Sequence, residues 1–210
     1  DHIVQLETNK ELQDVYANAS LILTDGKPLL WIAKWYGTPI KEKISGSDLF
    51  PLLCDMAAKK GYRIFFLGAA EGVAAKAAEN LAKKYKGLQV VGTYSPPYGF
   101  EKNPEEMNKI KTMIKEANPH ILIVGLGCPK QEKFMYHHCA ELGVPISFGL
   151  GASFDFEAGN IKRAPRWMAN HGLEWLFRIT QDPKRMAKRY LVDDRKILGL
   201  AIKYRKVTGK

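Results

Sequence analysis

The chain has 210 residues, with 46% hydrophobic and 10% aromatic residues and a formal net charge of +10. These proportions are typical of a soluble globular domain, and no apolar run approaches the roughly 18 residues that a membrane-spanning helix needs. The chain does not start with a signal-peptide pattern. The three cysteines, Cys54, Cys128 and Cys139, lack metal-ligand spacing. We therefore expect a reducing, cytoplasmic setting.

The positive charge is concentrated in the last quarter of the chain. Residues 1–161 carry 18 basic and 18 acidic residues, whereas residues 162–210 carry 14 basic and 4 acidic residues. A neutral body with a cationic tail indicates an anionic partner, which could be phosphate groups, anionic lipid or nucleic acid.

Short apolar runs alternate with amphipathic segments along most of the chain. The runs predicted as strands are Leu21–Thr24, Arg63–Leu67, Leu88–Thr93, Ile121–Gly125 and Val144–Gly149. The predicted helices lie at about Ser47–Lys60, Gly72–Lys86, Pro104–Ala117 and Pro129–Leu142. Strands without charges fit a parallel sheet that is buried on both faces. The alternation predicts an α/β fold, a Rossmann-like parallel-sheet sandwich, with ligands at the carboxyl ends of the strands.

The alternation stops after the last of these strands. Residues beyond 166 predict only helices, around Gly172–Thr180 and Pro183–Lys206, with Asp182 suited to an N-cap and Pro183 to the first helical position. We expect a Rossmann-like catalytic body at residues 1–165 and a helical, basic C-terminal appendage at residues 166–210.

Two predicted strand ends carry candidate chemistry in the first half of the chain. Asp25 follows Thr24 and precedes Gly26, and it is either a turn residue that caps a helix or a general base for an acceptor hydroxyl. Gly68 begins a Gly-Ala-Ala-Glu-Gly segment that is either a tight turn or a loop for a nucleotide diphosphate. The segment lacks the GxGxxG spacing of a dinucleotide fingerprint.

The third strand end, Gly125–Glu132, is more informative. Lys130 and Gln131 lie in the first turn of the predicted helix, where they could bind phosphate and sugar hydroxyls, while Glu132 suits a helix N-terminus on electrostatic grounds. A nucleophilic Cys128 with His137 or His138 has nothing to fix its geometry, and His137-His138-Cys139 does not predict a zinc site.

A last glycine-rich segment, Gly149–Phe156, follows the final predicted strand. Its backbone and Ser153 could contact sugar or phosphate. Asp155 is either an acid, base or ligand residue or a structural turn residue, and the structural role is slightly favoured.

Six segments in one order carry a family resemblance: TDGKPL, KISGSDL, GLGCPKQEKF, GLGASFDFEAGNIKRAP, GLEWLFRI and DPKRMAKRYL. Together they resemble the WecG/TagA/CpsF glycosyltransferases (family 26) over about Asp1 to Leu191. These bacterial enzymes add N-acetylmannosamine or its uronic acid to an undecaprenyl-diphosphate-linked acceptor. The resemblance places a strand with a Thr-x-Asn motif just before Asp1, so we expect the sequence to be truncated there.

The resemblance implies inverting, metal-independent transfer from a UDP-sugar, with no cofactor. It implies Asp25 as the catalytic base, Gln131 in the active site, and Arg178, Arg185 and Arg189 as arginines that complete it. The full set expected to bind substrate is Thr24, Gly26, Gly68, Gly127, Pro129, Lys130, Gly151, Ser153, Asp155, Arg163 and Arg189. Arginine suits this role physically, because the chain lacks a DxD-type metal motif and guanidinium groups bind diphosphate bidentately.

The resemblance also implies an enzyme of cell-surface polysaccharide or teichoic acid synthesis. Its expected partners are the UDP-sugar donor, the polyprenyl-diphosphate-linked acceptor and an anionic membrane at the inner face of the plasma membrane, and a homo-oligomer stays open. The basic tail helix fits either packing on the core or binding to anionic lipid. A nucleic-acid-binding module is disfavoured by the neutral body, and a nucleotide-dependent oxidoreductase by the missing dinucleotide fingerprint.

Overall fold

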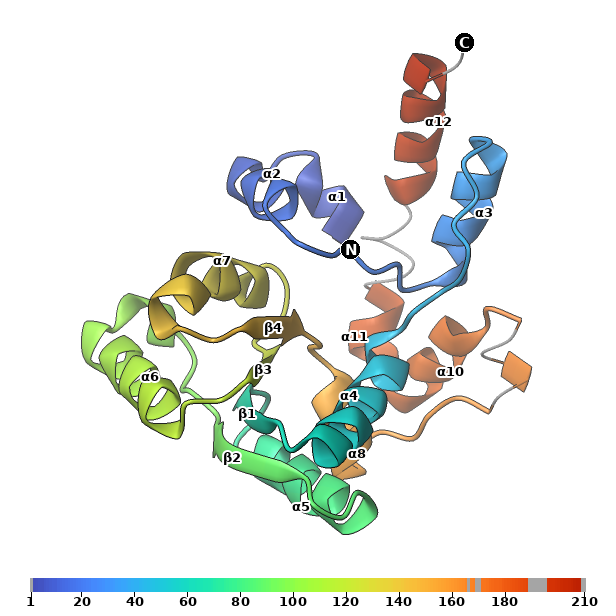
Figure 1. The fold of residues 1–210 in the computed structure, drawn as a ribbon. Coiled ribbons are helices and arrows are strands. Elements are labelled where there is room, and N and C mark those ends of the chain that lie inside the picture. The colour runs from blue at the N-terminus through green and yellow to red at the C-terminus, as the bar shows by residue number, and fades with distance from the viewer. Residues whose placement is uncertain (1, 166, 169–170, 189–195, 209–210) are drawn as a thin grey trace. The chain divides into compact units, whose positions relative to one another are not determined.

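The computed structural model describes residues 2–165, 167–168, 171–188 and 196–208 (Figure 1). The chain forms two compact units. The sheet unit is Gly46–Lys162, and the helical unit combines Asp1–Ser45 with Arg163–Lys210. The second boundary lies close to the predicted one near residue 165, and the first 45 residues group with the C-terminal segment. The roles assigned to a body and an appendage stay a prediction.

The sheet unit contains four parallel strands, as the sequence predicts. They are β1 (Arg63–Gly68), β2 (Gln89–Tyr94), β3 (Ile121–Gly125) and β4 (Ile146–Gly149), in the order β2-β1-β3-β4. The predicted Rossmann-like α/β fold is therefore confirmed.

Helices cover both faces of this sheet. On one face, Ile64 and Phe66 of β1 pack with α4 (Gly46–Lys60), α5 (Val73–Lys84) and α8 (Ser153–Ala158). On the other face, Phe65 and Leu67 pack with α6 (Pro104–Ala117) and α7 (Lys130–Leu142), near the short 3-10 helix η1 (Phe100–Lys102). Because successive residues of β1 point to opposite faces and all four are buried, the uninterrupted run Ile64–Leu67 reflects a strand covered on both sides.

The ends of α6 illustrate how local sequence sets helix boundaries. The Asn103 side chain accepts hydrogen bonds from the backbone N–H groups of Glu105 and Glu106, and Pro104 occupies the first turn. Asn118 ends the helix in the left-handed conformation, with φ 43°, directly before Pro119. The predicted helix at Pro104–Ala117 is confirmed to the residue.

The helical unit contains α1 (His2–Leu6), α2 (Lys10–Ala17), α3 (Lys27–Trp35), α10 (Glu174–Gln181), α11 (Pro183–Lys188) and α12 (Lys196–Thr208). A single helix is predicted at Pro183–Lys206; α11 lies within it, α12 extends two residues beyond its end, and residues 189–195 lie outside the described part of the chain. Among the described residues, no helix is long and apolar enough to cross a membrane.

The strand predicted at Leu21–Thr24 is wrong. These residues form an irregular segment in which Leu21 is 68% and Ile22 57% exposed. A β-rich run becomes a strand only when a neighbouring strand accepts its backbone hydrogen bonds, and every strand in the described part of the chain belongs to the sheet unit. The carbonyl of Thr24 accepts a hydrogen bond from the backbone N–H of Ile44 at 2.9 Å, which is a loop contact and not a strand ladder.

Replacement of Gly68 by alanine tests how tightly the strand ends pack. Gly68 has φ 111°, and a Cβ there would lie 2.4 Å from the carbonyl oxygen of Gly125. We expect Gly68→Ala to lower the free energy of unfolding by about 3 kcal/mol, measured by urea denaturation.

The matched control is Gly61→Ala, where φ is 70° and a Cβ would meet nothing within 4 Å. This control should cost only about 1 kcal/mol, the penalty of the left-handed backbone itself. Equal losses in the two variants would show that the Gly68–Gly125 contact imposes no steric constraint.

Candidate active site

The strand order creates a topological switch point at the carboxyl ends of β1 and β3. The chain leaves β1 through α5 toward β2 on one side, and leaves β3 through α7 toward β4 on the other. Because β1 and β3 are neighbours, with Gly68 paired to Gly125, the two connections diverge between them. Ligands of open α/β sheets bind at such a topological switch point.

Glycines bring the backbone close together at this edge. Gly68 lies against Gly125, and a Cβ on Gly125 would in turn lie 2.5 Å from the ring of Phe154. The N–H of Ala69 donates to the carbonyl of Gly125 at 2.8 Å, and the N–H of Leu150 donates to that of Val124 at 3.0 Å. The ends of β1, β3 and β4 are thus tied together through their backbones. The predicted site residue Gly68 belongs to this set.

Gln131 is a buried polar side chain beside these strand ends. Its backbone N–H donates to the carbonyl of Gly127 at 2.9 Å in the first turn of α7, after Pro129 at the N-cap position. Only 5% of Gln131 is exposed. Its Nε2 donates to Oε1 of Glu132 at 2.7 Å.

The Gln131 amide lies beside the last residue of β4 and the loop that follows it. A Cβ on Gly149 would lie 2.9 Å from Nε2, and one on Gly151 would lie 3.5 Å from Oε1. Among the described residues, no group donates a hydrogen bond to Oε1, although the atom is buried. A buried acceptor of this kind is rare in folded proteins and is available to a donor group of a ligand. The structure therefore brings Gln131 and Gly151, both predicted as site residues, together.

The side-chain ammonium group of Lys130 contacts a carboxylate and an aromatic ring. Its Nζ lies 2.6 Å from a carboxylate oxygen of Glu101 and 4.6 Å from the ring centre of Tyr98, which is fully exposed. The hydrogen bond from Lys130 is the largest cause of a lowered pKa of the Glu101 carboxyl. Lys130 is thus already paired with a carboxylate, and sequence reasoning missed both Glu101 and Tyr98.

The residues after β4 have well-defined contacts of their own. Ser153 is 4% exposed, and its Oγ lies 2.8 Å from the position of a Cβ on Gly46. Asp155 accepts a hydrogen bond from the Asn160 side chain at 3.2 Å, and its backbone carbonyl accepts from the N–H groups of Asn160 and Ile161. These contacts are those of a turn-stabilising residue, and the part that Asp155 plays at the site stays a prediction.

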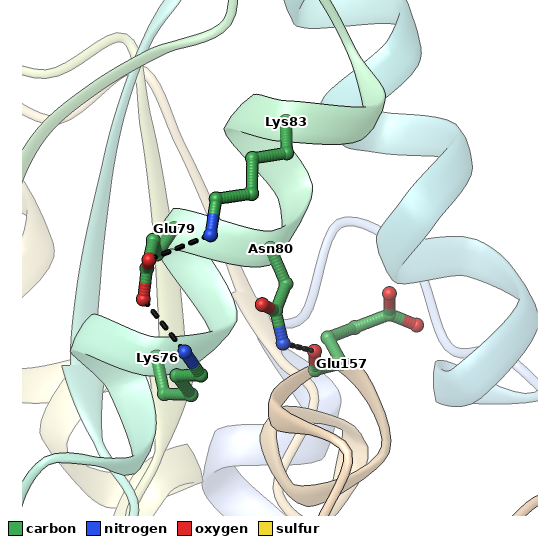
Figure 2. Close-up of polar contacts among 5 residues, drawn as sticks. All are labelled: Lys76, Glu79, Asn80, Lys83 and Glu157. Atoms are coloured by element: carbon green, nitrogen blue, oxygen red, sulfur yellow. Dashed lines mark hydrogen bonds and ion pairs between the residues drawn. The ribbon is translucent and has the colours of Figure 1, made fainter.

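Helix α8, which carries Ser153 and Asp155, is held against α5. Figure 2 shows the Asn80 side chain pointing from α5 toward Glu157, and its Nδ2 donates to the Glu157 carbonyl at 2.9 Å. On α5, the Glu79 carboxylate lies between two lysines, 2.8 Å from Nζ of Lys76 and 2.7 Å from Nζ of Lys83. The hydrogen bond from Lys76, followed by that from Lys83, lowers the pKa of Glu79 to about 2.

The remaining predicted residues belong to the helical unit. Asp25 is exposed and lies in the loop before α3. Gly26, with φ 111°, occupies the N-cap position of α3, so Asp25 is not that cap. Thr24 precedes it, and Arg163 is exposed at the start of the C-terminal segment.

Arg178, one of the predicted site arginines, forms an ion pair within its own helix. It lies on α10 and contacts Glu174 one turn earlier, with Nη2 and Oε1 3.3 Å apart. The same Glu174 carboxylate also lies 3.3 Å from Nζ of Lys43. Sequence reasoning missed Glu174, although its spacing of four residues from Arg178 is a readable helix-pair signal. Arg185 lies on α11, and Arg189 lies outside the described residues.

Comparison with known proteins identifies the family. The model of the glycosyl transferase WecG/TagA/CpsF family matches residues 1–210. The chain belongs to this family. It is similar to the N-acetylglucosaminyldiphosphoundecaprenol N-acetyl-beta-D-mannosaminyltransferase of Bacillus spizizenii strain W23, with 32% identity over 202 residues, 96% of this chain and 76% of the relative. The protein of the same name from Bacillus subtilis strain 168 is 33% identical over 177 residues, 84% of this chain and 67% of the relative.

Membership of the WecG/TagA/CpsF family confirms the resemblance inferred from the sequence. The individual site residues stay predictions.

Removal of the Lys130 ammonium tests the contact that lowers the pKa of Glu101. We expect Lys130→Met to raise this pKa toward its ordinary value, measured from the Glu101 carboxyl chemical shift by NMR. The stability contributed by the pair is present above the ordinary pKa of Glu101 and is lost as the pH falls through the lowered one. Lys130→Met should remove this pH-dependent contribution.

Lys102→Met is the matched control, because Lys102 is the weakest of the causes that lower the same pKa. It should move the Glu101 titration much less than Lys130→Met. A larger shift from Lys102→Met would contradict the described pairing.

Proposed function

We propose that this chain transfers an N-acetylmannosamine-type sugar from a UDP-sugar to an undecaprenyl-diphosphate-linked acceptor, with inversion at the anomeric carbon. The product would enter cell-surface polysaccharide or teichoic acid synthesis. Family membership supports the glycosyltransferase class. The names of both relatives specify an N-acetylglucosaminyldiphosphoundecaprenol acceptor and N-acetylmannosaminyl transfer, which supports the two substrates.

The observation that carries this proposal is the buried Gln131 amide at the glycine-rich carboxyl edge of the sheet. Oε1 of Gln131 is a buried acceptor, and a sugar hydroxyl or the N–H of an N-acetyl group would supply its donor. Glycine backbone at Gly127, where a Cβ would meet nothing within 4 Å, lets a diphosphate approach the main chain closely. The proposal adds the main chain of Gly68 and Gly151 at the neighbouring strand ends. In the proposal, Pro129 and Lys130 complete this surface at the start of α7, and Ser153 and Asp155 complete it at the start of α8.

Asp25 is the proposed catalytic base. Its carboxylate takes the proton of the attacking acceptor hydroxyl as the new bond forms between that oxygen and the anomeric carbon. The bond from the anomeric carbon to the diphosphate breaks on the opposite face, and UDP leaves with the bonding electron pair. Two features support this role: Asp25 is exposed, and the adjacent Gly26 makes the N-cap, which leaves the carboxylate out of that position.

Arginines are the proposed charge partners of the departing diphosphate. Arg178, Arg185, Arg189 and Arg163 are the residues assigned to this task, with Thr24 and Gly26 beside the base. Guanidinium groups bind phosphate oxygens bidentately and so replace a divalent cation. The proposal therefore includes activity without added metal. It also includes action at the inner face of the plasma membrane, where the basic C-terminal segment meets anionic lipid, and homo-oligomer formation stays open.

The direct assay uses a panel of UDP-sugars with a polyprenyl-diphosphate-linked N-acetylglucosamine acceptor, followed by anomeric analysis of the product. The proposal expects UDP-N-acetylmannosamine to be used, an inverted linkage, and an unchanged rate in the presence of a metal chelator. Retention of the anomeric configuration would contradict the single-displacement chemistry, and failure of every UDP-sugar would contradict the donor class.

Substitution of Asp25 tests the base. We expect Asp25→Asn to lower the transfer rate by about 10²–10⁴-fold while thermal unfolding is unchanged, because the amide cannot take up the proton. Asp55→Asn is the matched control, since Asp55 is a carboxylate of α4 paired with Lys59 and is assigned no role in transfer. Wild-type rates in Asp25→Asn would remove Asp25 from the mechanism.

Substitution of Gln131 tests the buried acceptor. Gln131→Met keeps similar volume but removes Oε1, and we expect about a tenfold loss of kcat/KM for one lost hydrogen bond to substrate. Gln89→Met, at the exposed amino end of β2, should leave kcat/KM unchanged. An unchanged kcat/KM in Gln131→Met would show that Oε1 does not bind substrate.

A further inference from the structure

Helix α3 is an apolar helix without a buried residue. Apart from Lys27 and Lys34, every residue of its sequence KPLLWIAKW is apolar, yet none is buried. Trp31 is 59% and Trp35 45% exposed. In a globular protein, a helix as apolar as this is normally covered. Its exposure indicates a surface that meets an apolar environment outside the described chain.

Helix α12 extends this surface. The hydroxyl of Tyr36, directly after α3, donates to the carbonyl of Ala201 at 2.6 Å, and the Arg205 guanidinium lies 4.2 Å from the ring centre of Trp35. The two helices therefore lie side by side within the helical unit (Figure 1). On α12, Leu198 is 66% and Ile202 54% exposed. We define the α3–α12 surface by these exposed apolar side chains and the basic residues near them, Lys34 on α3 and Arg205 on the same face of α12 as Leu198 and Ile202: Trp31, Trp35, Leu198, Ile202, Lys34 and Arg205.

The charge of the α3–α12 surface has one sign. Neither helix contains an aspartate or glutamate, whereas both carry lysine and α12 also carries arginine. Exposed tryptophans and aliphatic side chains interleaved with lysine and arginine are typical of protein segments that lie in a bilayer interface. A two-fold contact between copies would place the same cations against one another, which disfavours self-association through this face.

We propose that the α3–α12 surface docks on an anionic lipid bilayer, with Trp31 and Trp35 at headgroup level and Lys34 and Arg205 toward the anionic headgroups. This deepens the proposed function, since it rests on an acceptor that is held in a membrane. It assigns part of the membrane contact to the N-terminal segment, which the concentration of charge in residues 162–210 does not reveal.

Vesicle binding of the full chain tests this assignment. Wild-type protein and the double variant Trp31→Ala/Trp35→Ala are compared on vesicles of phosphatidylglycerol and phosphatidylcholine, by sedimentation and by the blue shift of tryptophan fluorescence. We expect the double variant to bind at least about tenfold more weakly, because two large apolar side chains are lost from the interface. The matched control is Trp167→Ala, which removes a tryptophan that is 61% exposed but lies outside both helices.

A second set of variants tests how the basic residues of the α3–α12 surface contribute to vesicle binding. Lys34→Gln and Arg205→Gln should each weaken binding to phosphatidylglycerol vesicles by about fivefold, and they should change binding to pure phosphatidylcholine much less. Leu198→Gln with Ile202→Gln repeats the apolar test on α12, in case the tryptophan variant does not fold. Equal vesicle binding by wild-type protein and folded variants of both helices would overturn the proposal. A change in oligomeric state without lipid, at unchanged vesicle binding, would assign the surface to self-association instead.

Transfer assays separate this inference from the proposed function. With a short-chain acceptor in aqueous solution, the tryptophan variant should match wild-type protein, whereas transfer to acceptor embedded in vesicles should fall along with vesicle binding. If wild-type protein transfers to neither acceptor, the proposed function fails, and the vesicle-binding result still decides the membrane surface. Equal loss with both acceptors would show that α3 acts on the chemistry and not on membrane docking.

Discussion

The close approach of β1 and β3 at their carboxyl ends is the constraint on which the candidate site depends. Gly68 and Gly125 face each other with no room for a Cβ, since one on Gly68 would lie 2.4 Å from the Gly125 carbonyl oxygen. Backbone hydrogen bonds from Ala69 and Leu150 tie the ends of three strands together at this edge. Side chains are absent from the packed glycines, so main-chain groups and the Gln131 amide dominate the surface that a ligand would meet.

In the helical unit, ion pairs balance part of the basic charge. Glu174 lies 3.3 Å from both Lys43 and Arg178, so part of the basic charge is balanced by a carboxylate within the unit. Helix α12 likewise contacts the N-terminal segment, where Glu7 lies 2.8 Å from Lys203. The basic residues are thus sorted by their surroundings: some are paired internally, and others lie among exposed apolar side chains. The proposals give these groups separate anionic targets, the diphosphate and the lipid headgroups.

The sequence predicts the sheet unit well because its signals are local. The apolar run at Ile64–Leu67 and the Asn103-Pro104 and Asn118-Pro119 boundaries each encode their structure within a few residues. Leu21–Thr24 shows the limit, since its β propensity is similar but the outcome depends on a partner strand. Helix α3 was not predicted either, because a short run as apolar as KPLLWIAKW does not by itself distinguish a helix from a buried strand.

The candidate site is likewise predictable only where its signals are local in the sequence. The glycines and Gln131 stand out because they follow buried strands, and topology alone brings such strand ends together. The contacts of Lys130 with Glu101 and of Asn80 with the Glu157 carbonyl join residues about 30 and 80 positions apart. No spacing rule links such residues in advance. These pairings emerge only from the packed structure.

Amide hydrogen exchange in the presence of UDP tests the central claim, that the crevice between β1 and β3 binds the donor nucleotide. The account predicts slower exchange in peptides that cover residues 67–72, 125–131 and 149–153, at the carboxyl ends of the strands. Peptides at the amino ends, around residues 61–64 and 143–146, should exchange as in the free protein. Calorimetry is used to verify that UDP binds. If UDP binds but slows exchange only outside the three carboxyl-end segments, the claim that the donor nucleotide binds between β1 and β3 is contradicted.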